Sequence, residues 1–236
     1  MAPAQLASPL WHVVTALAVV GTMAVHGGTV DAASREVAAV TSRSGDGSET
    51  YRGYRIEIGP DVPNAELDQL RRAAEHQVDL VEATGLDART KAFLRGVPVV
   101  VQSGSGAGSH YSGGDSVTIA VAAPGDDRPI LLHEYMHVYH FRMMPDGNRN
   151  PDILTYYERA KTGGFYPANA YLLKSPGEFF AMTASVYLHG KLAREPFTRE
   201  ELRQKQPVYF GYLHHLFGSP RAVSTEPPQI SGTVRP

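Results

Sequence analysis

The chain has 236 residues, of which 42% are apolar and 19% charged, and its formal net charge is −2. This length suits one globular domain, or one domain built in two lobes. The nearly neutral charge argues against a nucleic-acid partner and against electrostatic binding to a membrane. Cysteine is absent, which excludes disulfides and thiolate metal ligands. Any metal ion must therefore be held by His, Asp or Glu side chains.

The first 32 residues have the features of a secretory signal peptide. Residues 13–25 form an uncharged, largely apolar run that is too short for a comfortable membrane span. Val30-Asp31-Ala32 then supplies a small-x-Ala pattern, which predicts cleavage after Ala32. The segment before the run has no Lys or Arg, so an uncleaved anchor or an N-terminal extension of a cytoplasmic protein stays open. We expect a secreted or extracytoplasmic protein without stable membrane association after processing.

The composition of the rest of the chain divides it into three parts. Residues 33–50 are mostly small and polar and are expected to form a linker. Residues 51–218 carry the apolar periodicities of a folded domain. Residues 219–236 contain several prolines and no apolar period, which predicts a flexible tail.

The domain begins with strand and helix signals. Apolar residues alternate with charged ones over residues 54–58, which predicts a half-buried strand. A helix with one apolar stripe should start at Asp61 or Asn64 and end at Gly85.

Two further strands are expected over residues 97–101 and 117–121. A Gly- and Ser-rich loop, residues 103–115, separates them. The second of these strands is a candidate edge strand for pairing with an extended peptide. The loop is either a lid over such a peptide or an ordinary connection.

Residues 133–137 read H-E-Y-M-H, inside an apolar helix that should begin near residues 126–127. Side chains four positions apart lie on one helical face, so His133 and His137 can bind one metal ion together. Glu134 is rotated by about 100° from His133, which lets it act on a water molecule rather than on the metal. The motif predicts a catalytic zinc site that needs a third protein ligand. The alternative is a helix that binds no metal, in which the two histidines are stacked surface or core residues.

The second half of the chain contains mainly helix signals. Asn150-Pro151 should start one helix and Gly163-Gly164 should end it. Ser175 and Thr198 should each cap another. Because strands come first and helices later, the expected fold class is α+β, with a small mixed sheet lobe followed by a helical lobe.

The third ligand is not His140. His140 lies on the same helical face as His133, but the two residues are separated by two helical turns, roughly 10 Å. That distance is too long for both to bind one ion through bonds of about 2 Å. We expect His140 to be packed in the core or to support the ligands. Met143 stands where a metzincin would have its last histidine, which excludes that class.

Glu178 is the better candidate, because it opens an otherwise apolar helix in which an unpaired carboxylate would be costly. The alternative is structural: Ser175 and Glu178 have the spacing of a capping box. The two roles can overlap, since a helix start can orient a metal ligand.

The H133-E-Y-M-H137 motif, followed by E178-F-F-A, resembles the gluzincin metallopeptidases. The similarity is strongest to the group of the anthrax lethal factor catalytic domain and the Pro-Pro endopeptidases, and it covers residues 128–190. The resemblance implies a zincin-like fold in which Zn²⁺ is bound by His133, His137 and Glu178. It also implies that Tyr171, seven residues before the ligand glutamate, stabilises the oxyanion. Met182 departs from the family, which often has an acidic residue there, so the residue supporting the ligands is not assigned.

The expected function is therefore a secreted zinc endopeptidase, with Glu134 as general base and a peptide or protein as substrate. Two other classes stay open. One is a zinc-dependent hydrolase of another amide, such as a cell-wall bond. The other is a non-catalytic extracytoplasmic binding module with a zinc fold, although such a module has no use for Glu134.

Overall fold

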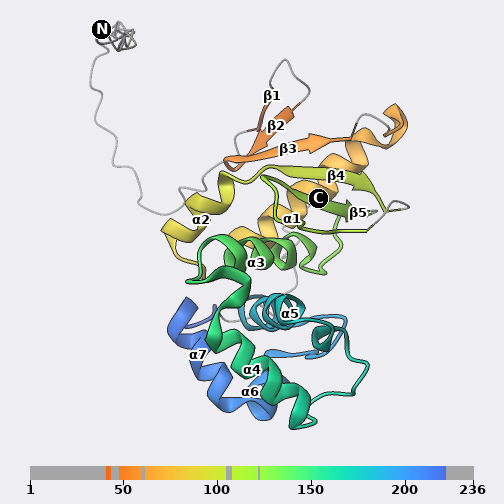
Figure 1. Ribbon diagram of the computed structural model, residues 1–236. Coiled ribbons are helices and arrows are strands. Elements are labelled where there is room, and N and C mark those ends of the chain that lie inside the picture. The colour runs from red at the N-terminus through yellow and green to blue at the C-terminus, as the bar shows by residue number, and fades with distance from the viewer. Residues whose placement is uncertain (1–40, 44–47, 60–61, 105–107, 122, 222–236) are drawn as a thin grey trace, which may run out of the picture. The chain divides into compact units, whose positions relative to one another are not determined.

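The structure, a computed structural model, describes residues 41–43, 48–59, 62–104, 108–121 and 123–221, shown in Figure 1. The expected signal peptide, its cleavage site and the tail after residue 221 lie outside these ranges. Within them, no helix is both long enough and apolar enough to cross a membrane. A sheet comes first and is followed by helices, which confirms the expected α+β class.

One five-stranded sheet contains the strands β1 (Thr41–Arg43), β2 (Ser48–Tyr51), β3 (Tyr54–Ile58), β4 (Val99–Ser103) and β5 (Val117–Val121), in that spatial order. The first three pair antiparallel, and β3, β4 and β5 pair parallel. The sheet is therefore mixed, as expected. Residues 41–43 and 48–50, expected to be linker, are strands instead. The turn at Arg52 and Gly53, both with positive φ, folds β2 back onto β3, and β1 pairs with the other edge of β2.

Two helices make the crossover from β3 to the parallel strand β4. They are α1 (Leu67–Glu82), preceded by the 3-10 turn η1 (Asn64–Glu66), and α2 (Ala88–Arg95). The buried face of α1 includes Leu70, Ala74 and Val78, as its apolar stripe predicted. The short helix α2 was not expected, and it begins where the Asp87 side chain accepts a hydrogen bond from the Thr90 backbone N–H at 2.8 Å.

The helix with the H-E-x-x-H motif, α3 (Ile130–Arg142), lies between the sheet and α5 (Figure 1). Its start differs from expectation, because neither Asp126 nor Asp127 caps it. The buried N–H of Leu131 instead donates to Gln77 Oε1 at 3.1 Å, and Gln77 Nε2 donates to the carbonyl of Arg128 at 2.9 Å. A buried side chain of α1 thus satisfies the backbone at the start of α3 and fixes where that helix begins.

The remaining helices form the second half of the domain. They are α4 (Pro151–Thr162), α5 (Pro176–His189), α6 (Arg199–Lys205) and α7 (Pro207–Phe217), with the 3-10 turns η2 (Gly147–Arg149) and η3 (Tyr171–Leu173). Asn150, Ser175 and Thr198 cap α4, α5 and α6 through their side chains, as the sequence predicted.

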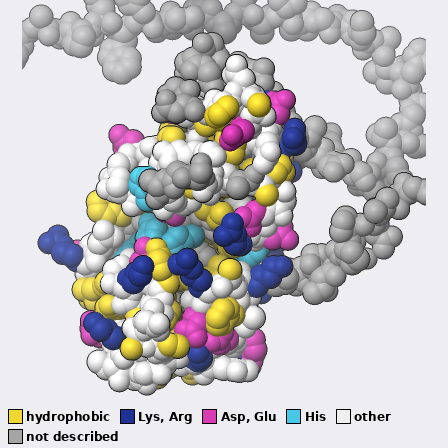
Figure 2. Space-filling view, turned by 90° about the vertical axis from the view of Figure 1, so that its right-hand side faces the viewer, with side chains coloured by type: hydrophobic (Ala, Val, Ile, Leu, Met, Phe, Trp, Pro, Cys, Tyr) yellow, Lys and Arg dark blue, Asp and Glu magenta, His cyan; other side chains and the backbone are white. Residues whose placement is uncertain are grey.

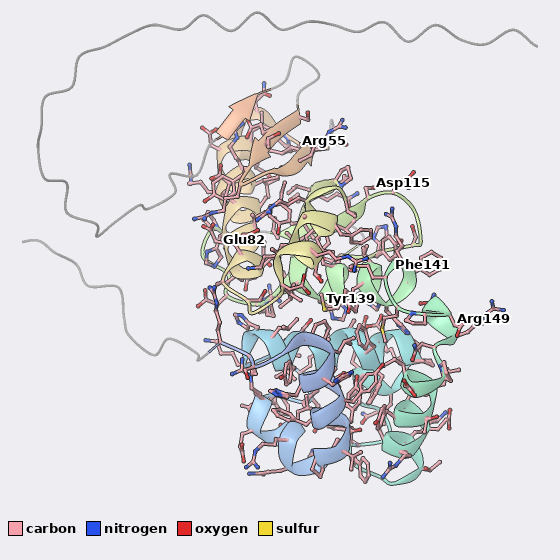
Figure 3. All side chains as sticks on the ribbon, turned by 90° about the vertical axis from the view of Figure 1, so that its left-hand side faces the viewer. Arg55, Glu82, Asp115, Tyr139, Phe141 and Arg149 are labelled. Atoms are coloured by element: carbon pink, nitrogen blue, oxygen red, sulfur yellow. The ribbon has the colours of Figure 1, made fainter. Side chains whose placement is uncertain are left out.

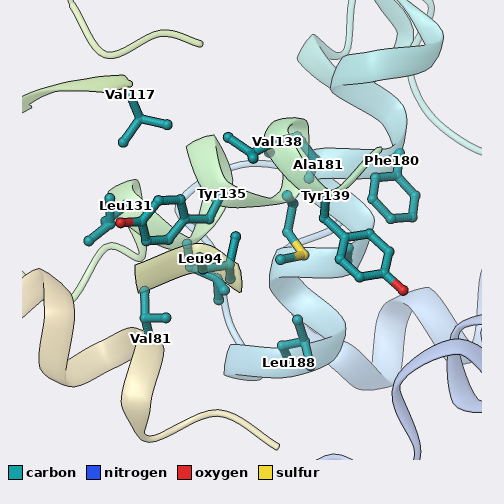
Figure 4. Packing of buried hydrophobic residues seen from close by; sticks show 14 of the residues in the cluster. Val81, Leu94, Val117, Leu131, Tyr135, Val138, Tyr139, Phe180, Ala181 and Leu188 are labelled. Atoms are coloured by element: carbon teal, nitrogen blue, oxygen red, sulfur yellow. The ribbon is translucent and has the colours of Figure 1, made fainter. Parts of the chain in front are cut away.

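One continuous core joins the two halves. Figure 4 shows Tyr135 of α3 directed toward Leu131 and Leu94, while Tyr139 of the same helix lies with Phe180 of α5. The Tyr135 hydroxyl donates to the carbonyl of Val97 at 3.1 Å, which ties α3 to the segment before β4. Because α3 is buried on both sides, its position and rotation are fixed by packing from the sheet and from the helices.

Candidate metal centre

Two histidines on α3 point their distal nitrogens at the same place. His133 Nε2 and His137 Nε2 lie 3.2 Å apart, and the two rings stand edge to face with centroids 4.8 Å apart. Both side chains are 17% exposed, which leaves their nitrogens reachable from solvent. Burial lowers the pKa of His133, although Glu178 acts in the opposite direction. The imidazole is therefore neutral at physiological pH, the state in which it binds a metal.

Glu178, on the first turn of α5, completes the group. Its backbone N–H donates to Ser175 Oγ at 3.1 Å, which is one half of a capping box. The carboxylate does not make the other half. Its Oε2 lies 3.3 Å from His133 Nε2 and 3.6 Å from His137 Nε2 instead. The cap fixes the backbone of Glu178, and the side chain is directed at the histidines.

These three side chains fit a tetrahedral zinc ion. Bonds of about 2.0–2.1 Å at tetrahedral angles separate neighbouring ligand atoms by roughly 3.3–3.4 Å. The observed separations of 3.2, 3.3 and 3.6 Å match that spacing. Glu178 Oε2 is fully buried and has no hydrogen-bond partner in the described structure. Because an unsatisfied buried carboxylate oxygen is costly, this atom fits a position that binds a cation.

Within the described residues, His133, His137 and Glu178 are the one group with the ligand types and spacing for a metal ion. His140 is not part of it. It is 1% exposed, packs against Phe180 with ring centroids 4.9 Å apart, and neither ring nitrogen has a partner there. Burial lowers the pKa of His140 to about 4, so it is a neutral core residue. Met182, at the position where related motifs carry an acid, is also buried.

Glu134 lies beside the group and is not part of it, since it is rotated away on α3 and only 4% exposed. Burial raises the pKa of its carboxyl to about 7, while His137 and the backbone N–H of Tyr111 act to lower it. A cation nearby favours the ionised form. A carboxyl with a pKa close to neutrality can both accept and return a proton at physiological pH.

Tyr171, in η3, is the fifth predicted site residue, and it does reach the group. Its hydroxyl donates to Glu178 Oε1 at 3.3 Å. Burial raises its pKa, and the neighbouring Glu178 adds to the rise. The hydroxyl therefore keeps its proton and is available as a donor.

A cleft of about 540 Å³ opens beside His137. Its lining includes Tyr111 and Gly113 from the loop before β5, Phe141 from the end of α3, and Pro176 at the start of α5. Among the described residues, no charged side chain lines it apart from the histidine. Its position next to the metal ligands makes it a candidate site for part of a substrate.

The expectation that β5 offers its free edge to a peptide is wrong at Thr118 and Ala120, whose backbone groups are already paired. Thr118 exchanges both backbone hydrogen bonds with His110, at 2.9 and 3.0 Å, and the Ala120 N–H donates to Ser109 Oγ at 2.9 Å. Ser109 and His110 of the predicted loop thus cover this part of β5. Whether this loop acts as a lid stays a prediction.

Two side chains near the group carry no signal in the sequence. Lys174 Nζ and the guanidinium carbon of Arg194 lie 4.2 and 4.6 Å from the ring centroid of Tyr171. Lys174 is three residues from Tyr171, but Arg194 is 23 residues along the chain. No motif spacing links them, so only the fold brings them together.

Comparison with known proteins does not identify a family for this chain. No protein-family model and no curated protein matches the chain. Among solved structures, the Pro-Pro endopeptidase PPEP-2 from Paenibacillus alvei is similar, with a TM-score of 0.47 and 16% identity over 69% of this chain and 97% of that one. A likeness this distant assigns no activity, so the case for function depends on the site itself.

Proposed function

We propose that this chain is a secreted zinc-dependent endopeptidase. The observation that carries the proposal is the triangle of His133, His137 and Glu178, with its ligand atoms 3.2–3.6 Å apart around a carboxylate oxygen that has no other partner. Three N and O ligands with an open fourth position are typical of catalytic rather than structural zinc.

A bound zinc ion would supply a water nucleophile at neutral pH and polarise the scissile carbonyl. Glu134 accepts the proton of the attacking water and returns it to the departing amine, for which a pKa near 7 is well suited. The Tyr171 hydroxyl, 3.3 Å from Glu178, donates to the carbonyl oxygen as negative charge develops in the transition state. The uncharged cleft beside His137 receives a substrate side chain.

The test combines metal analysis with a peptide-library digest. The purified full chain should contain one zinc per molecule and should lose both zinc and activity on chelation. His133→Ala should lose the metal, whereas His140→Ala, on the same helix but outside the group, should retain it. Cleavage of peptidoglycan amides without cleavage of any peptide would replace the peptidase proposal with the cell-wall alternative. Zinc without any hydrolysis would favour the binding module.

Secretion is part of the proposal and depends on the sequence alone. The expected product of processing begins at Ala33, directly after the small-x-Ala pattern that ends at Ala32. Mass spectrometry of the exported protein should find its N-terminus within a few residues of this point. Recovery of the full-length chain from the cytoplasm would remove secretion from the proposal and leave the site chemistry untouched.

A further inference from the structure

The ring of Tyr171 lies between two positive charges. Lys174 Nζ is 4.2 Å from the ring centroid, and the guanidinium carbon of Arg194 is 4.6 Å from it, both within the range of a cation–π contact. Because the hydroxyl of the same tyrosine contacts Glu178, the two cations lie one side chain away from the metal ligands.

Neither cation is neutralised by the described protein. Both side chains are exposed, and neither Lys174 nor Arg194 forms an ion pair with any carboxylate in the ranges that the structure covers. Other exposed cations do find partners, such as Arg203 with Glu200 at 2.6 Å. Figure 2 shows Lys and Arg side chains gathered beside the exposed histidines on one face. Since the formal net charge of the chain is −2, this positive region is local and not a consequence of overall composition.

The backbone holds Arg194 in place. It lies in a turn between α5 and α6 that is closed by hydrogen bonds from Leu192 N–H to the Phe197 carbonyl at 2.8 Å and from Arg199 N–H to the Gly190 carbonyl at 3.0 Å.

The cleft beside His137 has the opposite character, because its lining contains neither carboxylates nor Lys or Arg, and neither Lys174 nor Arg194 belongs to it. A peptide bound across the metal centre would therefore contact the uncharged cleft beside His137 in one region and the side chains of Lys174 and Arg194 in another. Residues of an extended peptide are spaced by roughly 3.3 Å, so a carboxylate one or two residues from the scissile bond can reach the cations. We infer that the substrate is a peptide with an acidic side chain next to the scissile bond, bound by Lys174 and Arg194. The inference rests on the proposed peptidase function.

The experiment uses the zinc-loaded full chain and matched peptides. A library digest first identifies a cleaved sequence, and kcat/KM is then measured on Glu and Gln versions at each position flanking the cleaved bond. The Glu peptide should be preferred by about tenfold at one position, since an exposed charge pair is worth up to about fivefold and two cations act. The preference should shrink at high ionic strength.

Charge reversal supplies the control. In Lys174→Glu and Arg194→Glu variants the ratio of kcat/KM for the Glu and Gln peptides should fall by about fivefold each, while Arg194→Lys should preserve most of it. Lys161→Glu is the matched control, because Lys161 also lies over a tyrosine, Tyr157, at 5.6 Å, but outside the site. The ratio separates substrate binding from a general loss of activity, which would lower both rates equally.

The possible results distinguish the acidic-substrate inference from the peptidase proposal. Peptide cleavage without an acidic preference, or with a preference that the Lys174 and Arg194 variants leave unchanged, would overturn this inference and leave the peptidase proposal intact. A zinc-loaded chain that cleaves no peptide would overturn both.

Discussion

Two clusters of polar side chains in this molecule have similar composition but opposite states of pairing. In the first, Glu82 of α1 accepts hydrogen bonds from the Tyr54 hydroxyl at 2.8 Å and from Arg95 at 2.7 Å, and Lys91 Nζ lies 3.7 Å from its other oxygen. In the second, Glu178 Oε2 faces two imidazole nitrogens and has no hydrogen-bond partner. Figure 3 locates Glu82 in the sheet-bearing half, away from Tyr139 of α3 at the junction of the halves.

The difference separates a structural cluster from a candidate metal centre. Glu82 is surrounded by donors, so its charge is compensated by the protein and joins β3, α1 and α2. Glu178 accepts a hydrogen bond from Tyr171 at Oε1, but its Oε2 faces two imidazole nitrogens that can bind a metal through lone pairs. A cation at this position would therefore complete the compensation of its charge. Removing a carboxylate should therefore reduce stability at the first cluster and metal binding at the second.

The largest expected effect is on turnover. Glu134→Gln should lower kcat by at least about 10²–10⁴, because the amide cannot accept the proton of the attacking water. Zinc content should be unchanged, since Glu134 is not a ligand. Glu82→Gln is the matched control, in which a half-buried carboxylate is lost from the structural cluster and turnover by the folded protein is retained. Activity of the Glu134 variant within tenfold of the original would end the proposed mechanism.

Tyr171→Phe should have the next largest effect, a fall in kcat of about 10²–10³ with zinc affinity unchanged, as is typical when one donor to a developing oxyanion is removed. Tyr54→Phe removes a hydroxyl that bonds a carboxylate in the other cluster. It should lower the melting temperature and leave the turnover of the folded protein unchanged. An equal loss of turnover in both variants would mean that Tyr171 is a packed aromatic residue.

A stability measurement compares the two glutamates directly. Glu82→Gln should lower the free energy of unfolding by about 1–3 kcal/mol, because charged donors lose their partner. Glu178→Gln in the metal-free protein should cost less than about 1 kcal/mol, since Oε2 has no hydrogen bond to lose. Zinc at 100 times its Kd should stabilise the original protein by about 2.7 kcal/mol and the Glu178 variant much less. A large metal-independent loss at Glu178 would indicate a cap rather than a ligand.

The sequence predicted the grouping of His133, His137 and Glu178 better than it predicted the surrounding fold. The closeness of the two histidines follows from helical spacing, and Glu178 is recognisable because it opens an apolar helix, while the roles of these residues stay predictions. The start of α3 was missed, because the group that satisfies its first N–H, Gln77, is 54 residues earlier in the chain. Strands β1 and β2 were missed because their short, mostly polar segments have no clear alternation and are stabilised by pairing, β1 with β2 and β2 with β3. The contact of Arg194 with Tyr171 was missed for the same reason as the contact of Gln77 with α3. A contact that depends on tertiary packing leaves no local pattern in the sequence.

The smallest expected effect is the pH dependence of the structural cluster. Burial acts to raise the pKa of Glu82, but hydrogen bonds from Tyr54 and Arg95, with the nearby charge of Lys91, outweigh it and hold the pKa below its ordinary value. A carboxyl whose pKa is lower in the folded state than in the unfolded state, about 4.3 for Glu, binds its proton more weakly when folded. Its contribution to stability is therefore complete above about pH 5 and is lost as the pH falls below 4 through the folded value.

Urea unfolding of the original protein and of Glu82→Gln between pH 7 and pH 3 should show this directly. The difference in unfolding free energy between the two proteins should be constant from pH 7 to about pH 5 and should shrink below pH 4, since the charge is then lost from the original protein as well. Glu57→Gln, at a partly exposed position on β3 that is paired with Arg55 at 2.9 Å, provides the comparison and should cost less than about 1 kcal/mol at pH 7, because exposed ion pairs contribute little to stability. A difference that grows as the pH falls would mean that the pKa of Glu82 is raised by folding, and the cluster would then not be the fully compensated one described above.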